Sequence, residues 1–493
     1  MTSQYRRGLV FNEKDIFSRG SAGRTGVDFA DTGIPDADLN EFAPEDFRRN
    51  GLEGFPELSE PEVIRHYTRL SQWNYGVDAN LYPLGSCTMK HNPRVNEAVA
   101  RLKGFTGLHP LQPDTAAQGT LKIIHDLGRW LCEVVGLDEA TLQPAAGAHG
   151  EFTGLLAIRG ALTKRGNPRS KVLLPDSAHG TNPASATYCG YQAVTIKSGA
   201  DGKIDLQELD KLMDENVAAL MVTNPNTLGI FESNIVEAAK IVHSRGGFLY
   251  ADGANLNALI GKARFGDMGV DVCHINLHKT FSTPHGGGGP GAGPVCVVKE
   301  LEPFLPAPMV VESNGAYRLD YDRPHSVGRV HGFHGNVGVL LRAAAYILTV
   351  GASGLKEAAE AAVLNANYIK ARLKDYYNVP VPGLSLHECV FNDKKQNEYG
   401  VTTLDIAKGL IDRGYHPPTI YFPLIVRGAL MIEPTETESL ETLDEFCEAM
   451  IDIAKTAETD PESLKRAPVN AFVSRLDEAQ AARNPDLRCE LCR

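Results

Sequence analysis

Between residues 171 and 298 the sequence alternates short, continuously apolar runs with longer amphipathic segments. The apolar runs cover residues 171–174, 192–196, 219–223, 247–250, 272–276 and 295–298, and the amphipathic segments include residues 206–216 and 235–245. Strands that are apolar on both faces and alternate with helices form a buried, largely parallel sheet with helices packed on it. The chain is therefore predicted to have an α/β fold built around such a sheet.

The length of 493 residues is more than one compact core usually holds, so we expect several domains. Residues 1–75 are predicted to form an extended, polar N-terminal arm that ends in a helix over 61–72. Residues 76–335 are predicted to form the large sheet domain, and residues 336–376 a connecting helical region that breaks near Gly351. Residues 377–493 are predicted to form a small α+β domain, with strands over 421–426 and 429–433 and a helix over 438–457.

The composition excludes several classes of function. Hydrophobic residues make up 43% and charged residues 22% of the chain, which is ordinary for a soluble globular protein. A formal net charge of −12 argues against nucleic acid or an anionic membrane as the main partner. No apolar run was found that approaches the roughly 18 residues needed to span a bilayer, and the N-terminus lacks the features of a targeting peptide. We therefore expect a cytoplasmic protein.

The nine cysteines are scattered and odd in number, which suits a reducing compartment better than a disulfide framework. Cys489 and Cys492 have the spacing of half a zinc site or of a redox pair. No second pair with matching spacing accompanies them, so no metal site is predicted.

A lysine stands at the end of one predicted strand. The apolar run from Val272 leads directly to His278 and Lys279, and a loop with four consecutive glycines, 286–289, follows. A lysine amine can attack an aldehyde to form a Schiff base, and backbone without side chains lets a planar ring approach closely. The pattern predicts that Lys279 binds an aldehyde cofactor.

An aspartate stands at the end of the preceding predicted strand. Asp252 opens the sequence Asp-Gly-Ala-Asn, and ligands of parallel sheets collect beyond the carboxyl ends of the strands. A lysine for the aldehyde and a carboxylate for the pyridinium nitrogen are the groups that pyridoxal 5'-phosphate most needs from a protein. This cofactor is therefore predicted, with Lys279 and Asp252 as catalytic residues.

Other residues are predicted to complete the cofactor site. Residues 143–158 form a small-residue turn that leads into a helix, and the free backbone N–H groups of such a turn bind phosphate. His179, also predicted to be catalytic, follows a strand end and is expected to stack on the ring opposite Ala254. The full cofactor-binding set comprises Gly147, Ala148, His149, His179, Asn224, Asp252, Ala254, Asn255, Asn276, His278 and Lys279.

With these residues in place, the chain resembles the fold-type I pyridoxal phosphate enzymes. More narrowly, it resembles glycine dehydrogenase (decarboxylating), the P-protein family of the glycine cleavage system, in its two-subunit form. The matching segments are residues 65–72, 82–90, 175–185, 276–280, 285–291 and 431–436. The run Tyr-Pro-Leu-Gly-Ser-Cys-Thr-Met-Lys over 82–90 is much more specific than a general pyridoxal phosphate motif.

The resemblance implies an activity and a set of partners. Glycine would lose its carboxyl carbon as CO2 through a Schiff base to pyridoxal phosphate, and the aminomethyl group would pass to the lipoyl arm of the H-protein. The loop of Ser86, Cys87 and Thr88 would form a wall of the substrate pocket. Single-chain P-proteins contain two homologous halves, and this chain resembles the half that carries the lysine. A related subunit without that lysine, glycine dehydrogenase subunit 1, is therefore expected as a partner, in a heterotetramer.

Two alternatives remain open at this stage. The lysine and aspartate also fit another fold-type I enzyme, such as a cysteine desulfurase or an amino-acid decarboxylase. A non-catalytic homologue that supports a partner subunit is the second alternative, although such a subunit would not need Lys279. A homodimer that completes its own sites is the alternative to the heterotetramer.

Overall fold

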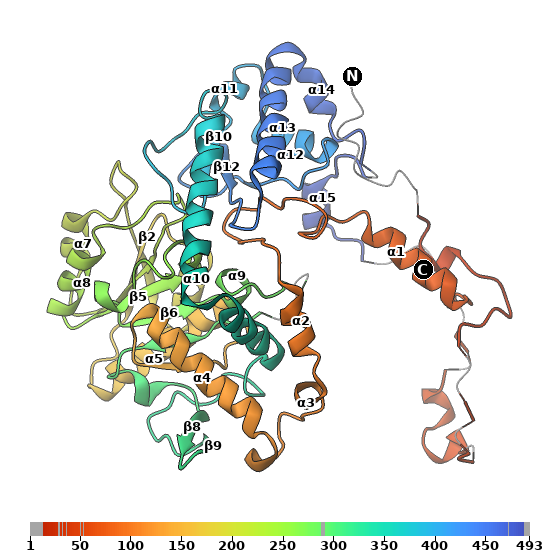
Figure 1. Cartoon of the computed structure of the whole chain (residues 1–493), viewed down its shortest axis with the longest axis horizontal. Helices are drawn as coiled ribbons and strands as arrows, with labels where there is room; N and C mark the ends of the chain where they lie inside the picture. The colour runs from red at the N-terminus through yellow and green to blue at the C-terminus, as the bar shows by residue number, and fades with distance from the viewer. Residues whose placement is uncertain are drawn as a thin grey trace.

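The computed structural model describes residues 13–487, except residues 28, 29, 32, 36, 50, 53, 287–290 and 472. Its largest element is a seven-stranded sheet with the order β1-β7-β6-β5-β4-β2-β3 (Figure 1). The strands are β1 (Glu139–Thr141), β2 (Lys171–Pro175), β3 (Gln192–Ile196), β4 (Val217–Thr223), β5 (Phe248–Gly253), β6 (Val272–Ile275) and β7 (Val295–Val297). The pairs from β3 to β6 are parallel, and β7 is antiparallel to both β6 and β1. The predicted α/β fold with a largely parallel sheet is confirmed.

Helices cover both faces of this sheet, because successive residues of a strand point to opposite faces. On β4, Leu220 and Val222 join one hydrophobic core, whereas Ala219 and Met221 join another. The first core includes residues of α4 (Gln118–Val135), α8 (Ile235–Ser244) and α10 (Val337–Leu373). The second includes residues of α5 (Gly147–Lys164) and α6 (Thr181–Tyr188). Each strand of the centre is therefore buried on both sides, as its continuous apolar sequence predicted.

A smaller antiparallel sheet lies in the C-terminal part of the chain. It has the order β10-β12-β11, from β10 (Cys389–Asn392), β12 (Ala429–Ile432) and β11 (Thr419–Ile420). The helices α12 (Thr403–Asp412) and α13 (Leu440–Thr459) share a hydrophobic core with it. The predicted strand over 421–426 was wrong. Tyr421 has a φ of 57°, and Pro423 has no N–H to donate, so the backbone leaves the sheet after Ile420.

Helix α10 joins the two sheets, as Figure 1 shows. It runs for 37 residues and departs from helical geometry at Gly351, where φ is 64° and ψ is −176°, close to the predicted break. By length and composition alone it is apolar enough to cross a membrane, so the prediction that no apolar segment approaches that length was wrong. Core helices of globular proteins meet the same criterion, and Leu340 and Ala343 of α10 are fully buried against the large sheet.

The N-terminal segment leads away from the body of the molecule to α1 (Glu60–Ser71), in which the predicted helix is confirmed (Figure 1). Glu13 ties the two ends of this segment together, because its carboxylate binds Arg69 and His66 on α1 as well as Arg19. A hairpin that the sequence did not predict, β8 (Met309–Ser313) and β9 (Ala316–Asp320), follows the large sheet.

Candidate active site

The sheet brings the predicted catalytic residues to one edge. In the parallel ladder Thr223 of β4 lies opposite Asp252 of β5, and Asp252 lies opposite His274 of β6. The short helix α9 (Leu277–Thr280) begins two residues after β6 and carries Lys279. All of these side chains therefore stand at the carboxyl ends of parallel strands, where α/β proteins bind their ligands.

Lys279 is buried and points to a loop from a distant part of the sequence. Lys279 is only 7% exposed, and its Nζ donates a hydrogen bond to the Ser86 carbonyl oxygen at 2.8 Å. Ser86 thus meets the lysine through its backbone, and its hydroxyl oxygen has no partner among the described residues. Burial raises the pKa of the neighbouring Cys87 to about 11, with Lys279 opposing that shift. Cys87 is therefore held as a thiol rather than a thiolate.

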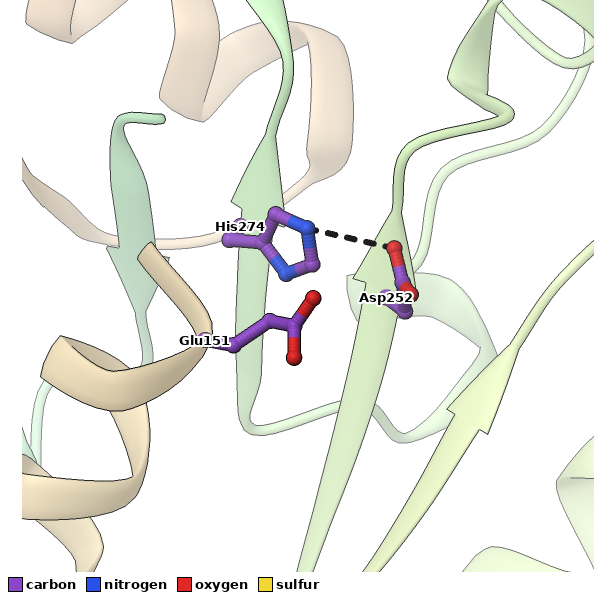
Figure 2. A group of neighbouring side chains, drawn as sticks. All are labelled: Glu151, Asp252 and His274. Atoms are coloured by element: carbon purple, nitrogen blue, oxygen red, sulfur yellow. Dashed lines mark ion pairs between the residues drawn. The ribbon is translucent and has the colours of Figure 1, made fainter. Parts of the chain in front are cut away.

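Asp252 is the centre of a buried polar network (Figure 2). His274 Nε2 lies 3.2 Å from Oδ1, and Asn182 Nδ2 donates to Oδ2 at 3.0 Å. Burial by itself favours the neutral acid, but the charge and hydrogen bond of His274 outweigh it and hold the pKa of Asp252 well below its ordinary value. For His274, burial lowers the pKa, and the opposing interaction with Asp252 raises it overall. The two side chains form a buried ion pair.

Glu151 of α5 lies beside this pair, as Figure 2 shows. The three acid and imidazole groups lie close enough to hold a cation, since their ligand atoms are within 4.8 Å of one another. However, both oxygens of Glu151 accept hydrogen bonds from α6, from Thr181 Oγ1 at 2.5 Å and from Ser185 Oγ at 2.8 Å. Both ring nitrogens of His274 are also engaged, Nδ1 with the Tyr250 hydroxyl at 3.1 Å. These contacts identify a hydrogen-bonded network that orients Asp252.

Sequence reasoning missed the residues that surround Asp252. They are Glu151, Asn182, Thr223 and His274. The one available signal was the position of His274 in the strand next to that of Asp252. Its use required the strand register, which only the assembled sheet supplies.

The predicted phosphate turn lies at the start of α5. Gly147 is the first helical residue, and a Cβ there would stand 2.3 Å from Asn276 Oδ1, so only glycine fits. No side chain caps this helix end, which leaves its first N–H groups available to an anion. Ala148 follows within the first turn. The His149 ring accepts a hydrogen bond from Ala145 N at 3.1 Å and stacks on His331, which anchors the turn.

His179 and Ala254 both contact the Asp252 network through their backbone, His179 N with Thr223 Oγ1 and Ala254 N with Asp252 Oδ1. The His179 ring is held by Thr181 Oγ1 at 3.0 Å from Nδ1, and burial lowers its pKa, which favours the neutral imidazole. Ala254 is 5% exposed, and its N–H donates to Asp252 Oδ1 at 2.9 Å.

The predicted asparagines and His278 are held by the backbone around the site. Asn224 Oδ1 accepts from Glu232 N at 3.0 Å, and Asn255 Nδ2 donates to the Pro225 carbonyl at 2.9 Å. His278 packs against the glycine loop, where a Cβ on Gly291 would lie 2.9 Å from its Nδ1. Burial lowers the pKa of His278 to about 3, so it is neutral. Of the predicted run of four glycines, residues 287–289 lie outside the described residues, as do Cys489 and Cys492.

The residues at this edge fit the expected cofactor. Three buried polar atoms of the predicted set have no hydrogen-bond partner among the described residues: Asn224 Nδ2, Asn255 Oδ1 and Asn276 Oδ1. An unsatisfied buried polar atom costs about 1–3 kcal/mol, so a cluster of them is expected where a ligand supplies the partners. Glycine is required at positions 147 and 293, since a Cβ there would lie 2.3 Å from Asn276 Oδ1 and 2.1 Å from the Ala146 carbonyl oxygen, respectively, and these backbone segments therefore pack closely at the site.

The chain is similar to known proteins in both sequence and structure. Two family descriptions match the chain: "Glycine dehydrogenase, C-terminal domain" over residues 358–472 and "Aminotransferase class-V" over residues 155–381. Two curated relatives are 56% identical and are both called probable glycine dehydrogenase (decarboxylating) subunit 2. The protein from Bacillus licheniformis aligns over 96% of this chain and 98% of its own length, and that from Caldanaerobacter subterraneus over the same shares.

A solved structure shares the fold. It is glycine decarboxylase (P-protein) of the glycine cleavage system in inhibitor-bound form, with a TM-score of 0.71 and 24% identity. The match covers 84% of this chain and 94% of that chain.

Proposed function

Because the chain belongs to the glycine dehydrogenase (decarboxylating) subunit 2 family, whose members depend on pyridoxal phosphate, we propose that it decarboxylates glycine and passes the aminomethyl group to the lipoyl arm of an H-protein. The family assignment carries the class of reaction. The substrate, the acceptor and the roles of the individual residues are our proposal.

The observation that supports a catalytic subunit is the placement of Lys279. Its amine is buried at the carboxyl edge of the sheet, with Ser86 O as its hydrogen-bond acceptor and Asp252 at the end of the neighbouring strand. A homologue that only supports a partner would not need an amine in this position. Lys279 is therefore assigned as the residue that binds the cofactor aldehyde.

Bound pyridoxal phosphate supplies a ring that accepts the electron pair released when the carboxyl carbon of the substrate departs. Asp252 would hold a negative charge next to the ring nitrogen, and His274, Asn182 and the Ala254 N–H fix the direction of its carboxylate. The neutral His179 imidazole offers a flat face for stacking, opposite Ala254. Gly147, Ala148 and His149 present the start of α5 to the phosphate.

Further members of the proposed site supply hydrogen bonds or form its wall. Asn224, Asn255 and Asn276 each have an amide atom without a hydrogen-bond partner in the described part of the chain, and these atoms would serve the polar groups of the cofactor. His278 packs against Gly291, and Ser86, Cys87 and Thr88 are proposed as the wall next to the substrate.

We further propose that the chain works with a related second subunit. The curated relatives carry the words "subunit 2", and this chain covers 98% of the length of the first two relatives. A heterotetramer of two chains of each kind, which a lipoylated H-protein meets transiently, is the proposed assembly. The seven cysteines of the described part of the chain are all free thiols, which supports a reducing compartment, and we propose the cytoplasm.

The test is exchange of the glycine carboxyl carbon with labelled bicarbonate, measured on the complex with its partner subunit. Exchange should proceed with lipoylated H-protein. With the same H-protein lacking its lipoyl group, the exchange rate should be at least about tenfold lower. Alanine should not replace glycine. Release of sulfide from cysteine at a rate above that of glycine exchange would instead identify a desulfurase and reject the proposal.

A further inference from the structure

Two buried glutamates from the small sheet reach the loop that contacts Lys279. Glu388 directly precedes β10, and Glu433 directly follows β12. Both residues have an exposed fraction of 0%. Charged side chains are almost never buried to this extent unless other groups pair with them.

The partners of both glutamates lie in the loop of Ser86, Cys87 and Thr88. Ser86 N donates to Glu388 Oε2 at 2.8 Å. Thr88 donates twice to Glu433, through N to Oε2 at 2.9 Å and through its hydroxyl to Oε1 at 2.5 Å. Ser86 and Thr88 have φ values of 63° and 51°, a conformation that non-glycine residues rarely adopt. The hydrogen bonds to the two carboxylates stabilise this strained backbone.

The same loop receives the amine of Lys279. Ser86 donates its N–H to Glu388, and its carbonyl oxygen accepts the hydrogen bond from Lys279 Nζ. Any movement of the loop would therefore move the acceptor of the amine. Glu388 is linked to Lys279 through Ser86 alone, whereas Glu433 holds the same loop two residues further on, at Thr88.

The two carboxylates differ in how well they are satisfied. Glu433 accepts three hydrogen bonds, the third from Asn257 Nδ2 at 3.3 Å. Glu388 accepts one, and its Oε1 has no hydrogen-bond partner among the described residues. The ring nitrogens of the adjacent His387 also have no hydrogen-bond partner there, and Nε2 lies 3.7 Å from Glu388 Oε2. Burial, together with the charge of Glu433, raises the pKa of Glu388 well above its ordinary value. Carboxylate oxygens of the two glutamates lie within 4.8 Å of each other. Two like charges this close in a buried site do not both ionise.

We propose that Glu388 and Glu433 are positioning residues that hold the Ser86–Thr88 loop and thereby fix the Lys279 amine. This inference rests on the proposed function only in taking Lys279 as the reactive amine. Neither glutamate is placed in contact with the substrate. Glu388 acts through the backbone of Ser86, and Glu433 acts through Thr88 in the same loop.

Cys87, in the middle of the loop, reports on the charge of the pair without any cofactor. Burial raises the pKa of its thiol, and the negative charge of Glu433 adds to that effect. The titratable or charged groups that face this loop or its two glutamates are Tyr82, Lys279, His285, His387, Glu388 and Glu433. Loss of the Glu433 charge should therefore favour the thiolate, which is the form that reacts with alkylating reagents.

The first experiment measures alkylation of Cys87 by iodoacetamide from pH 7 to pH 10 in the full-length, cofactor-free chain, with mass spectrometry to locate the label. Glu433→Gln should accelerate the reaction at pH 8 at least about tenfold, the effect of one pKa unit. Glu388→Gln should stay within about twofold of the wild type, because an amide replaces a neutral acid of the same shape. Asp405→Asn is the matched control, since it alters a buried carboxylate that caps α12 away from the site.

The second experiment uses the complete complex with bound cofactor. Glu433→Gln should lower kcat for glycine exchange at least about tenfold with KM nearly unchanged, and should change the pH profile of the cofactor absorbance. Glu388→Gln should keep most of the activity, whereas Glu388→Ala, which removes the acceptor for Ser86 N, should lose it. If Glu433→Gln does not fold, Thr88→Val removes one hydrogen bond and leaves both carboxylates, and kcat should still fall several-fold.

Two outcomes would overturn the inference. One is a Glu433→Gln variant that behaves like Asp405→Asn in both experiments. The other is a Glu388→Gln variant as impaired as Glu388→Ala, since Glu388 would then be ionised. A chain that does not turn over glycine at all would reject the proposed function, but the alkylation of Cys87 would still decide whether the glutamates hold the loop.

Discussion

His274 Nε2 lies 3.2 Å from Asp252 Oδ1, and each of these side chains is 1% exposed. The sheet imposes the contact, because the two residues are partners in the parallel ladder of β5 and β6. The ion pair thus reaches its position through backbone hydrogen bonds and does not depend on mobile surface groups. Removing one member of a buried ion pair leaves the other charge uncompensated, at a cost of about 3–5 kcal/mol.

The first prediction concerns Asp252→Asn. The substitution removes the carboxylate charge that would keep the cofactor nitrogen protonated, so glycine exchange should fall at least about a hundredfold, equal to roughly 3 kcal/mol in the barrier. The cofactor should still bind, since the other proposed contacts remain. Exchange rates and cofactor absorbance of the purified complex check both statements, and near-normal turnover would show that Asp252 has another role.

The second prediction concerns the pH dependence of stability. The folded-state pKa of Asp252 is lowered, so its stabilisation is present above the ordinary value of 3.8 and is lost as the pH falls towards the folded value. The folded-state pKa of His274 is raised, so its stabilisation is present below 6.5 and is lost as the pH rises through the folded value. A double-mutant cycle with Asp252→Asn and His274→Asn, followed by urea unfolding, should show the largest coupling between about pH 4 and pH 6.5. Coupling that is flat from pH 3 to pH 9 would contradict the ion pair.

The strands and the ends of two of them could be predicted from the sequence. The buried strands can be recognised in the sequence because each is a continuous apolar run, and Lys279 and Asp252 stand at the ends of two such runs. The predicted strand at Tyr421 failed, because the run is apolar but Tyr421 has a positive φ and Pro423 interrupts the backbone donors.

The residues that orient the site could not be predicted in the same way. Glu388 and Glu433 lie about 300 and 345 positions beyond the loop that they contact. No local pattern marks a contact across such a distance, and a buried glutamate looks in the sequence like any glutamate at a strand end. Three-dimensional packing alone brings these residues together.

The third prediction concerns Lys279. Borohydride treatment of the holoenzyme should attach the cofactor covalently to this residue, and peptide mapping would locate it. Lys279→Ala should abolish glycine exchange and leave the midpoint of thermal unfolding of the cofactor-free chain nearly unchanged, because the amine makes a single hydrogen bond there. Recovery of the adduct at a different lysine would refute the assignment.

The fourth prediction concerns the attachment of the N-terminal segment to α1. The hydrogen bond from Arg69, with His66 and Arg19, lowers the pKa of Glu13 to about 2. The contact should therefore hold above the ordinary value of 4.5 and loosen as the pH falls towards about 2. Glu13→Gln should increase hydrogen exchange in α1 at neutral pH, whereas Glu60→Gln, an exposed position on the same helix, should not. Equal exchange in both variants would show that Glu13 does not anchor the segment.

The last prediction concerns the need for a second subunit. The curated relatives match this chain over nearly their whole length and yet are called a subunit, so we expect the chain alone to lack full activity. When the purified chain alone is given cofactor, glycine, labelled bicarbonate and lipoylated H-protein, it should exchange the carboxyl carbon at a small fraction of the rate of the complex. Addition of the related subunit that lacks the lysine should restore exchange, and light scattering should report a heterotetramer. Full exchange by a homodimer of this chain would instead mean that it completes its own sites.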